Sequence, residues 1–186
     1  MSESNSNVIP AINAVDGFNP ADFVRTTVGE EGENDLYLDG VDFDDRIIDA
    51  FCMNMVTDPS QFDVVVFPNL YGDIASDLAA GLVGGLGIAP GANIGKEYAV
   101  FEAVHGSAPN IAGQNKANPT AEILSAAMML DHLGELEAAA RIRRAVTEVY
   151  SAGECLTGDI RNLTGSDKPA ASCTEFTDAL VAALAK

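Results

Sequence analysis

Residues 69–87, NLYGDIASDLAAGLVGGLG, place two carboxylates, Asp73 and Asp77, four residues apart at the start of an Ala-rich run. Because an α-helix has about 3.6 residues per turn, positions i and i+4 lie on one face. Two carboxylates on one face can share a hard cation such as Mg²⁺ or Mn²⁺. Acids in a first helical turn also stabilise the helix dipole, so the spacing alone leaves both explanations open.

The sequence around this stretch predicts alternating strands and helices. Residues 44–58 have helical periodicity, and residues 63–67 (DVVVF) form a continuous apolar run typical of a strand buried on both faces. Glycines at 84, 85 and 87 are expected to end the helix. Strands are then expected within residues 87–95 and 97–106.

The C-terminal part predicts three further helices. One spans about Thr120 to Leu133 with Gly134 as its stop, a second spans residues 135–152, and a third begins at Thr174 with an opening like a capping box. A loop rich in Gly, Ser and Pro separates the last two. Strands alternating with helices indicate a layered α/β domain, although about three strands are few for a complete doubly wound sheet.

Charge and composition exclude some classes of partner. The chain has 186 residues, 47% of them hydrophobic, with 28 acidic against 10 basic residues and a net charge of −18. This balance argues against nucleic acid and anionic membranes as partners. The sequence holds no apolar run of about 18 residues, so no membrane span is expected. The polar start MSESNSN is unlike a signal peptide or a mitochondrial transit peptide.

Residues 1–45 differ from the rest of the chain. Residues 1–50 hold 12 of the acids and only two arginines, and they show the least periodicity. We expect an irregular acidic leader over residues 1–45, with short strands near 7–12 or 36–38, and a folded domain over residues 46–186. The three cysteines, Cys52, Cys155 and Cys173, have no metal-type spacing and are expected to be reduced thiols.

A second group of polar residues lies in FEAVHGSAPNIAGQNKANP, residues 101–119. Small and turn-forming residues alternate there with His105 and three asparagines. Such a loop lets backbone N–H groups approach a phosphate or a base. It has neither the GxGxxG nor the GxxxxGK spacing, so chemistry alone favours an ordinary surface loop.

Together these segments resemble the β-decarboxylating dehydrogenases, the family of isocitrate and isopropylmalate dehydrogenases. The matching stretches are DPSQFDVVVFPNLYGDIASDLAAGLVGGLGIAPGANIG, FEAVHGSAPNIAGQNKANPTAEILSAAMMLDHLG, TGDI and SCTEFTDAL, in the family's order. The resemblance covers residues 46–186. It implies a partial fold of this family, the C-terminal part of its large domain, in which a sheet is layered with helices.

The resemblance assigns a metal site. Asp73 and Asp77 match two of the family's three Mg²⁺ or Mn²⁺ ligands, and Asp49 matches the third, which extends over a dimer interface to the metal of the partner protomer. The implied reaction is metal-dependent oxidative decarboxylation of a 2-hydroxy acid, isocitrate to 2-oxoglutarate and CO₂, as in the tricarboxylic acid cycle. The chain is therefore expected in a homo- or hetero-oligomer.

The resemblance also assigns a nucleotide site to the loop. It implies that eight residues contact or adjoin the cofactor: Glu102, His105, Gly106, Ala108, Asn110, Ile111, Asn118 and Asp159.

Charge at the expected ribose contacts favours NAD over NADP. NADP-using relatives pair the 2′-phosphate with Lys, Tyr and Arg, whereas the matching positions here hold Asn110, Ile111, Gly158 and Asn162. None of these is cationic. NAD-using relatives usually place Asp where Asn110 stands, and an amide does not repel the phosphate, so discrimination against NADP is expected to be looser.

Several alternatives stay open. The family's catalytic Tyr and Lys and its substrate-binding arginines belong to the half of the family sequence that has no match here. Tyr37 and Arg25 lie in surroundings unlike the family motifs. The run at residues 49–74 and the segments 153–163 and 172–180 resemble isocitrate dehydrogenases more than isopropylmalate dehydrogenases. A non-catalytic, truncated or regulatory subunit that needs a full-length partner is the other interpretation. The expected compartment is the cytoplasm, or the mitochondrial matrix of a eukaryote.

Overall fold

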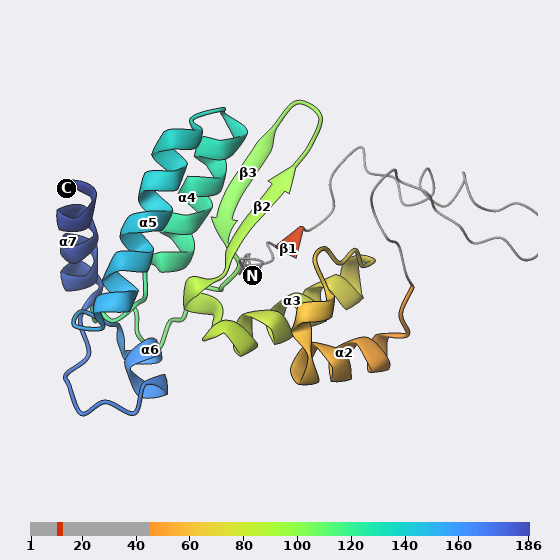
Figure 1. The fold of residues 1–186 in the computed structure, drawn as a ribbon, viewed down its shortest axis with the longest axis horizontal. Helices are drawn as coiled ribbons and strands as arrows, with labels where there is room; N and C mark the ends of the chain where they lie inside the picture. Colours follow the sequence, from red (N-terminus) through yellow and green to blue (C-terminus); the bar gives the residue numbers. More distant parts are fainter. Residues whose placement is uncertain (1–10, 13–44) are drawn as a thin grey trace, which may run out of the picture.

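The computed structural model describes residues 11–12 and 45–186 (Figure 1). Its elements are β1 (Ala11–Ile12), α2 (Ile48–Thr57), η1 (Pro59–Gln61), α3 (Asn69–Val83), η2 (Leu86–Ile88), β2 (Pro90–Ile94), β3 (Ala99–Ala103), α4 (Thr120–His132), α5 (Leu136–Ala152), α6 (Gly158–Leu163) and α7 (Cys173–Leu184), where η marks a short 3₁₀ turn. The predicted α/β class is confirmed.

The described strands form one small sheet with helices stacked beside it. The strand order is β1-β2-β3, in which β2 is parallel to β1 and antiparallel to β3. Helix α4 packs against β2 and β3, and α5 packs against both α4 and α7. Figure 1 shows α4, α5 and α7 side by side to the left of the β2–β3 hairpin, with α3 below the hairpin and α2 beside α3. None of the described helices is long and apolar enough to cross a membrane.

The helix stack has a closed core. Its buried residues come from α5 and α7, and partly buried side chains of α4 pack against them. Phe176 on α7 is fully buried and Leu180 is 4% exposed. We name this part, residues 120–184, the C-terminal stack.

A second core joins α2 to α3. Phe51 and Met55 on α2 and Ala75 on α3 are buried, and Phe62 and Phe67 from the connecting segment pack against them. The Phe51 ring centroid lies 5.0 Å from that of Phe62 and 4.8 Å from that of Phe67. We name this part, residues 47–83, the α2–α3 unit.

The helix predictions are confirmed with small shifts. The helix after Asn69 ends at Val83, and Gly84 follows with φ of 126°, a conformation that favours glycine. Gly134 similarly follows α4 with φ of 83°. The capping box is present at α7, although its N-cap is Ser172, and the helix begins one residue before Thr174.

The predicted strand at residues 63–67 is wrong. The segment carries no strand pairing, because no described strand lies beside it to share backbone hydrogen bonds. Val65 and Phe67 pack on the α2–α3 core, whereas Val64 is 72% and Val66 is 59% exposed. The run is therefore covered on one face only.

One further expectation changed, and the remaining ones can be compared with the structure. The segment after residue 152 is not all loop, because it contains α6 and an isolated bridge between Thr157 and Ala171. Of the two strands expected in the leader, one is present as β1 at Ala11–Ile12, and the other, near 36–38, lies outside the described residues. All three cysteines are unpaired, as expected.

Candidate metal and nucleotide site

Helix α3 places Asp73 and Asp77 beyond its first turn. The helix begins at Asn69, so its first turn holds no acid, whereas the sequence alone predicted a start near Asp73. A helix dipole acts mainly within the first turn, so dipole stabilisation does not explain this pair. Both residues are exposed. Among the described residues, neither carboxylate receives a hydrogen bond or an ion pair, and both are open to a cation.

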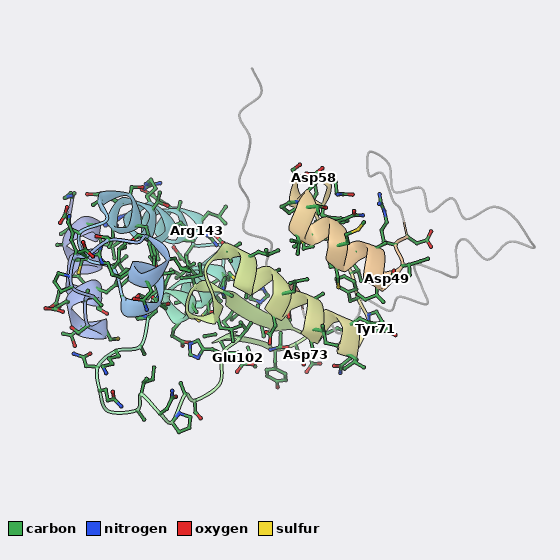
Figure 2. All side chains as sticks on the ribbon, turned by 90° about the horizontal axis from the view of Figure 1, so that it is seen from below. Asp49, Asp58, Tyr71, Asp73, Glu102 and Arg143 are labelled. Carbon is green, nitrogen blue, oxygen red and sulfur yellow. The ribbon has the colours of Figure 1, made fainter. Side chains whose placement is uncertain are left out.

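Asp49 stands apart from that pair. It lies in the first turn of α2 and is exposed, and its Oδ1 accepts a hydrogen bond of 2.6 Å from the N–H of Ala50. Figure 2 shows Asp49 and Asp73 on separate helices. The described residues contain no group of three His, Cys, Asp or Glu side chains arranged to hold a metal. Within the described residues of one copy, the predicted site is thus a pair of carboxylates.

The segment between β3 and α4 is a series of tight turns. Ala108, Gly113 and Asn115 have φ of 41°, 73° and 57°, the left-handed region. Successive i to i+3 backbone hydrogen bonds close the turns, the first from the N–H of Ile111 to the carbonyl of Ala108. The loop is therefore held by hydrogen bonds within its own backbone. Most of its residues are exposed, including His105 and Asn110.

The C-terminal part of this loop is fixed to the C-terminal stack at two points. Asn115 accepts at its backbone carbonyl from the N–H of Cys173 (2.9 Å) and at Oδ1 from the N–H of Thr174 (3.2 Å). Three residues further on, Asn118 is only 8% exposed and its Oδ1 accepts from the N–H of Thr120 at the start of α4 (3.0 Å). The loop therefore has firm anchors on α7 and α4.

Asn118 and Asp159 meet at the base of the loop. Asn118 Nδ2 donates to Asp159 Oδ2 over 2.9 Å, although the two residues are 41 positions apart. The other carboxylate oxygen, Oδ1, accepts from Thr157 Oγ1 over 2.6 Å. Gly87 passes close by: a Cβ there would lie 2.8 Å from Asp159 Oδ2 and 3.0 Å from Asn118 Cβ. These contacts join η2, the loop and α6.

The hydroxyl of Tyr150 extends this network. It lies 3.2 Å from Asn118 Nδ2 and 2.7 Å from Thr120 Oγ1. Burial raises the pKa of Tyr150, an effect that the hydrogen bonds from Thr120 and Asn118 oppose and the Asp159 charge reinforces. The phenol therefore stays neutral and able to donate at neutral pH.

None of the other predicted nucleotide residues hydrogen-bonds to this pair among the described contacts. Glu102 on β3 accepts a hydrogen bond of 3.2 Å from Asn93 of the neighbouring strand. His105 Nδ1 lies 3.0 Å from the carbonyl oxygen of Gly106, which can only accept, so this nitrogen carries the proton in that contact. The described structure thus unites two of the eight predicted residues, Asn118 and Asp159.

Sequence reasoning missed Gly87, Thr120, Tyr150 and Thr157 in this network. Tyr150 could not be singled out from the sequence, because its position fits the apolar face of helix α5. The positions of Thr120 and Thr157 beside Asn118 and Asp159 were a usable signal, since a hydroxyl near a helix start commonly bonds a neighbouring side chain or backbone group.

The chain is similar to subunits of mitochondrial NAD isocitrate dehydrogenase. The chain is 56% identical over 142 residues to the probable alpha subunit of mitochondrial NAD isocitrate dehydrogenase from Caenorhabditis elegans, covering 76% of this chain and 37% of that one. It is 53% identical over 139 residues to the alpha subunit of mitochondrial NAD isocitrate dehydrogenase from Homo sapiens, covering 74% and 36%. The chain thus spans little more than a third of the length of these relatives.

A solved structure and a family model give the same assignment. The crystal structure of isocitrate dehydrogenase from Methylococcus capsulatus superposes with a TM-score of 0.73 at 53% identity, covering 78% of this chain and 42% of that one. Residues 18–180 match the model of the isocitrate/isopropylmalate dehydrogenase family, a match that begins within the segment 1–45. The chain therefore belongs to the isocitrate/isopropylmalate dehydrogenase family.

Proposed function

We propose that this chain supplies the metal-binding and nucleotide-binding residues of an NAD-dependent isocitrate dehydrogenase. The observation that carries the proposal is the hydrogen bond between Asn118 and Asp159, which joins two separate segments that the family resemblance assigns to one nucleotide. The names of the relatives from Caenorhabditis elegans and Homo sapiens support the choice of NAD and isocitrate.

The exposed pair Asp73 and Asp77 fits a hard divalent cation. Their oxygens are the ligand type that Mg²⁺ and Mn²⁺ prefer, and the described residues leave them unpaired. When bound, the cation would stabilise the negative charge that develops on the substrate oxygen during decarboxylation. Asp49 would then complete the ligand set from a second protomer, which makes an oligomer part of the proposal.

The loop 104–119 and Asp159 are the residues proposed to hold NAD. NAD would accept the hydride from the hydroxyl-bearing carbon of the substrate. The chain's own part is to bind and orient: turns with exposed backbone at residues 108–113 approach the nucleotide, and Asn118 and Asp159 offer an amide and a carboxylate. Asn110 and Asn162 carry no cation for a 2′-phosphate, which supports NAD over NADP.

A non-catalytic subunit is the second candidate function. The chain is 54% identical to a regulatory subunit of mitochondrial NAD isocitrate dehydrogenase from Dictyostelium discoideum, over 142 residues that cover 76% of this chain and 38% of that one. Under this proposal, the chain binds a nucleotide or a partner subunit without turnover. The mitochondrial names of the relatives favour the mitochondrial matrix as the compartment for both candidates.

One assay separates the candidates. The purified chain is mixed with isocitrate, Mn²⁺ and NAD, alone and with a full-length NAD isocitrate dehydrogenase subunit, and reduced cofactor is followed by absorbance. The catalytic role is supported if either preparation reduces NAD and if this activity is lost when Asp73 and Asp77 of this chain are replaced. Binding to the full-length subunit with no such dependence favours the regulatory role. Turnover with isopropylmalate instead would overturn the substrate assignment.

The metal assignment has its own test. We expect Asp73→Asn and Asp77→Asn each to weaken Mn²⁺ binding at least tenfold, because each removes a charged ligand, about 1.4 kcal/mol or more. The control is Asp178→Asn, an exposed aspartate on α7, which should leave Mn²⁺ affinity unchanged. Electron paramagnetic resonance of free Mn²⁺ measures the affinity directly. Equal affinities in all four proteins would exclude the site.

A further inference from the structure

Tyr150 reaches the Asn118–Asp159 pair from α5, a helix that carries none of the residues assigned to the nucleotide. Its ring packs on Phe176, with centroids 5.5 Å apart, and Phe176 is fully buried in the C-terminal stack. The ring is thus held by the core while its hydroxyl points into the polar network. A rigid phenol in such a place can fix the orientation of its polar neighbours.

The orientation of the Asn118 amide follows from its partners. The backbone N–H of Thr120 can only donate, so it must face Oδ1. The amide nitrogen then faces Tyr150 and Asp159, and its two N–H groups match these two acceptors. Both ends of the amide are satisfied at a site that is 8% exposed.

Asn118 passes this constraint on to Asp159. The carboxylate accepts from Asn118 at Oδ2 and from Thr157 at Oδ1, so its plane is defined by two donors on different elements. Removing the Tyr150 hydroxyl would leave one amide N–H of Asn118 without its acceptor. An unpaired buried N–H group is unfavourable, so the amide would rotate or bind a water molecule. Either change moves the donor away from Asp159.

We propose that Tyr150 is a positioning residue. Its hydroxyl holds the Asn118 amide, and through it the Asp159 carboxylate, in the orientation that receives the adenine nucleoside part of a dinucleotide. The nucleotide part of this inference rests on the proposed function, whereas the orientation of Asn118 does not.

The first measurement is independent of nucleotide. In the full chain labelled with ¹⁵N, the side-chain amide protons of Asn118 should be resolved and protected from exchange with water. Tyr150→Phe keeps the ring on Phe176 and removes only the hydroxyl, so these signals should shift and lose protection. Tyr98→Phe is the matched control, because Tyr98 is 82% exposed at the hairpin tip. Unchanged Asn118 signals in Tyr150→Phe would overturn the proposal.

The second measurement is NAD affinity by calorimetry, well below the unfolding midpoint of each variant. Tyr150→Phe should raise the Kd for NAD about two- to tenfold, the loss of one hydrogen bond. In an Asn118→Ala background the same change should have no further effect, because Tyr150 acts through Asn118. A lower midpoint with an unchanged Kd would mean a purely structural role and would overturn the proposal.

The two readouts also separate this inference from the proposed function. NAD failing to bind the wild-type chain would overturn the proposed nucleotide role and the nucleotide part of this inference. The Asn118 signals would still decide whether Tyr150 orients the amide.

Discussion

The C-terminal stack and the α2–α3 unit are built from helices of similar length but are covered differently. The stack buries Phe176 and Leu180 between α5 and α7, with α4 packed alongside. The α2–α3 unit buries Phe51 between two helices and leaves its other faces open. Of the 18 exposed large apolar side chains in the described residues, ten lie within residues 47–83. The first region completes its own core, whereas the second offers apolar surface.

This contrast bears on function because the predicted metal ligands lie on the α2–α3 unit. Asp49, Asp73 and Asp77 are carried by α2 and α3, whereas Asn118 and Asp159 are fixed to the stack. Under the proposed function the active site is shared between protomers, and exposed apolar side chains gathered near the proposed metal ligands are typical of such an interface. The nucleotide residues need a rigid frame instead.

Substitutions of the central phenylalanine of each core should have the largest effect on stability. Phe176→Ala should lower the free energy of unfolding by about 3–5 kcal/mol, because it opens a cavity in a closed core. Phe51→Ala removes a similar ring but should expose only residues 48–83 to hydrogen exchange, because its cluster contains no residue of the stack. Loss of protection in α4 and α5 after Phe51→Ala would show that the two regions unfold as one.

A smaller effect is expected in η2, the short segment that follows the α2–α3 unit and contacts Asp159 of the C-terminal stack. Gly87→Ala should lower the free energy of unfolding by about 1–3 kcal/mol and weaken NAD binding, because its Cβ would overlap Asp159 and Asn118. The matched change is Gly81→Ala within α3, where a Cβ meets nothing within 4 Å. It should stabilise the chain by about 0.4–1 kcal/mol. Thermal unfolding measures the stability of both variants, and calorimetry measures their NAD affinity. If both substitutions changed stability equally and in the same direction, the close contact of Gly87 with Asp159 and Asn118 would be contradicted.

Self-association of the chain, or its binding to a partner chain, should depend on the α2–α3 unit and not on the C-terminal stack. Leu70→Lys combined with Ile74→Lys puts two charges on exposed α3 positions and should weaken self-association or binding to a partner chain at least tenfold, about 1.4 kcal/mol. Leu133→Lys with Val181→Lys makes the same change on the stack and should have no effect. Analytical ultracentrifugation measures both. A wild-type chain that sediments as a monomer with and without partner chains would refute this role.

Local patterns predicted the helices better than the strands. Glycines, caps and apolar periodicity are contained within each helix, so α3, α4, α5 and α7 follow from the sequence. The run 63–67 has strand composition, but pairing depends on a neighbour that the described residues do not provide. The Asn118–Asp159 contact came from family resemblance, because residues 41 positions apart leave no local pattern.

The smallest expected effect concerns the start of α7, which anchors the loop through Asn115. Glu175 accepts from the backbone N–H and the hydroxyl of Ser172, and these hydrogen bonds lower the pKa of this exposed carboxyl. A pKa below the unfolded value of 4.5 means that the stabilisation is complete above that pH and is lost as the pH falls through the folded value. Protection of α7 from hydrogen exchange should therefore decrease in acid. Glu175→Gln keeps a capping side chain without a titrating charge, so its protection should be lower at neutral pH and should change less as the pH falls. The same acid-dependent loss in both proteins would assign the effect to another carboxylate.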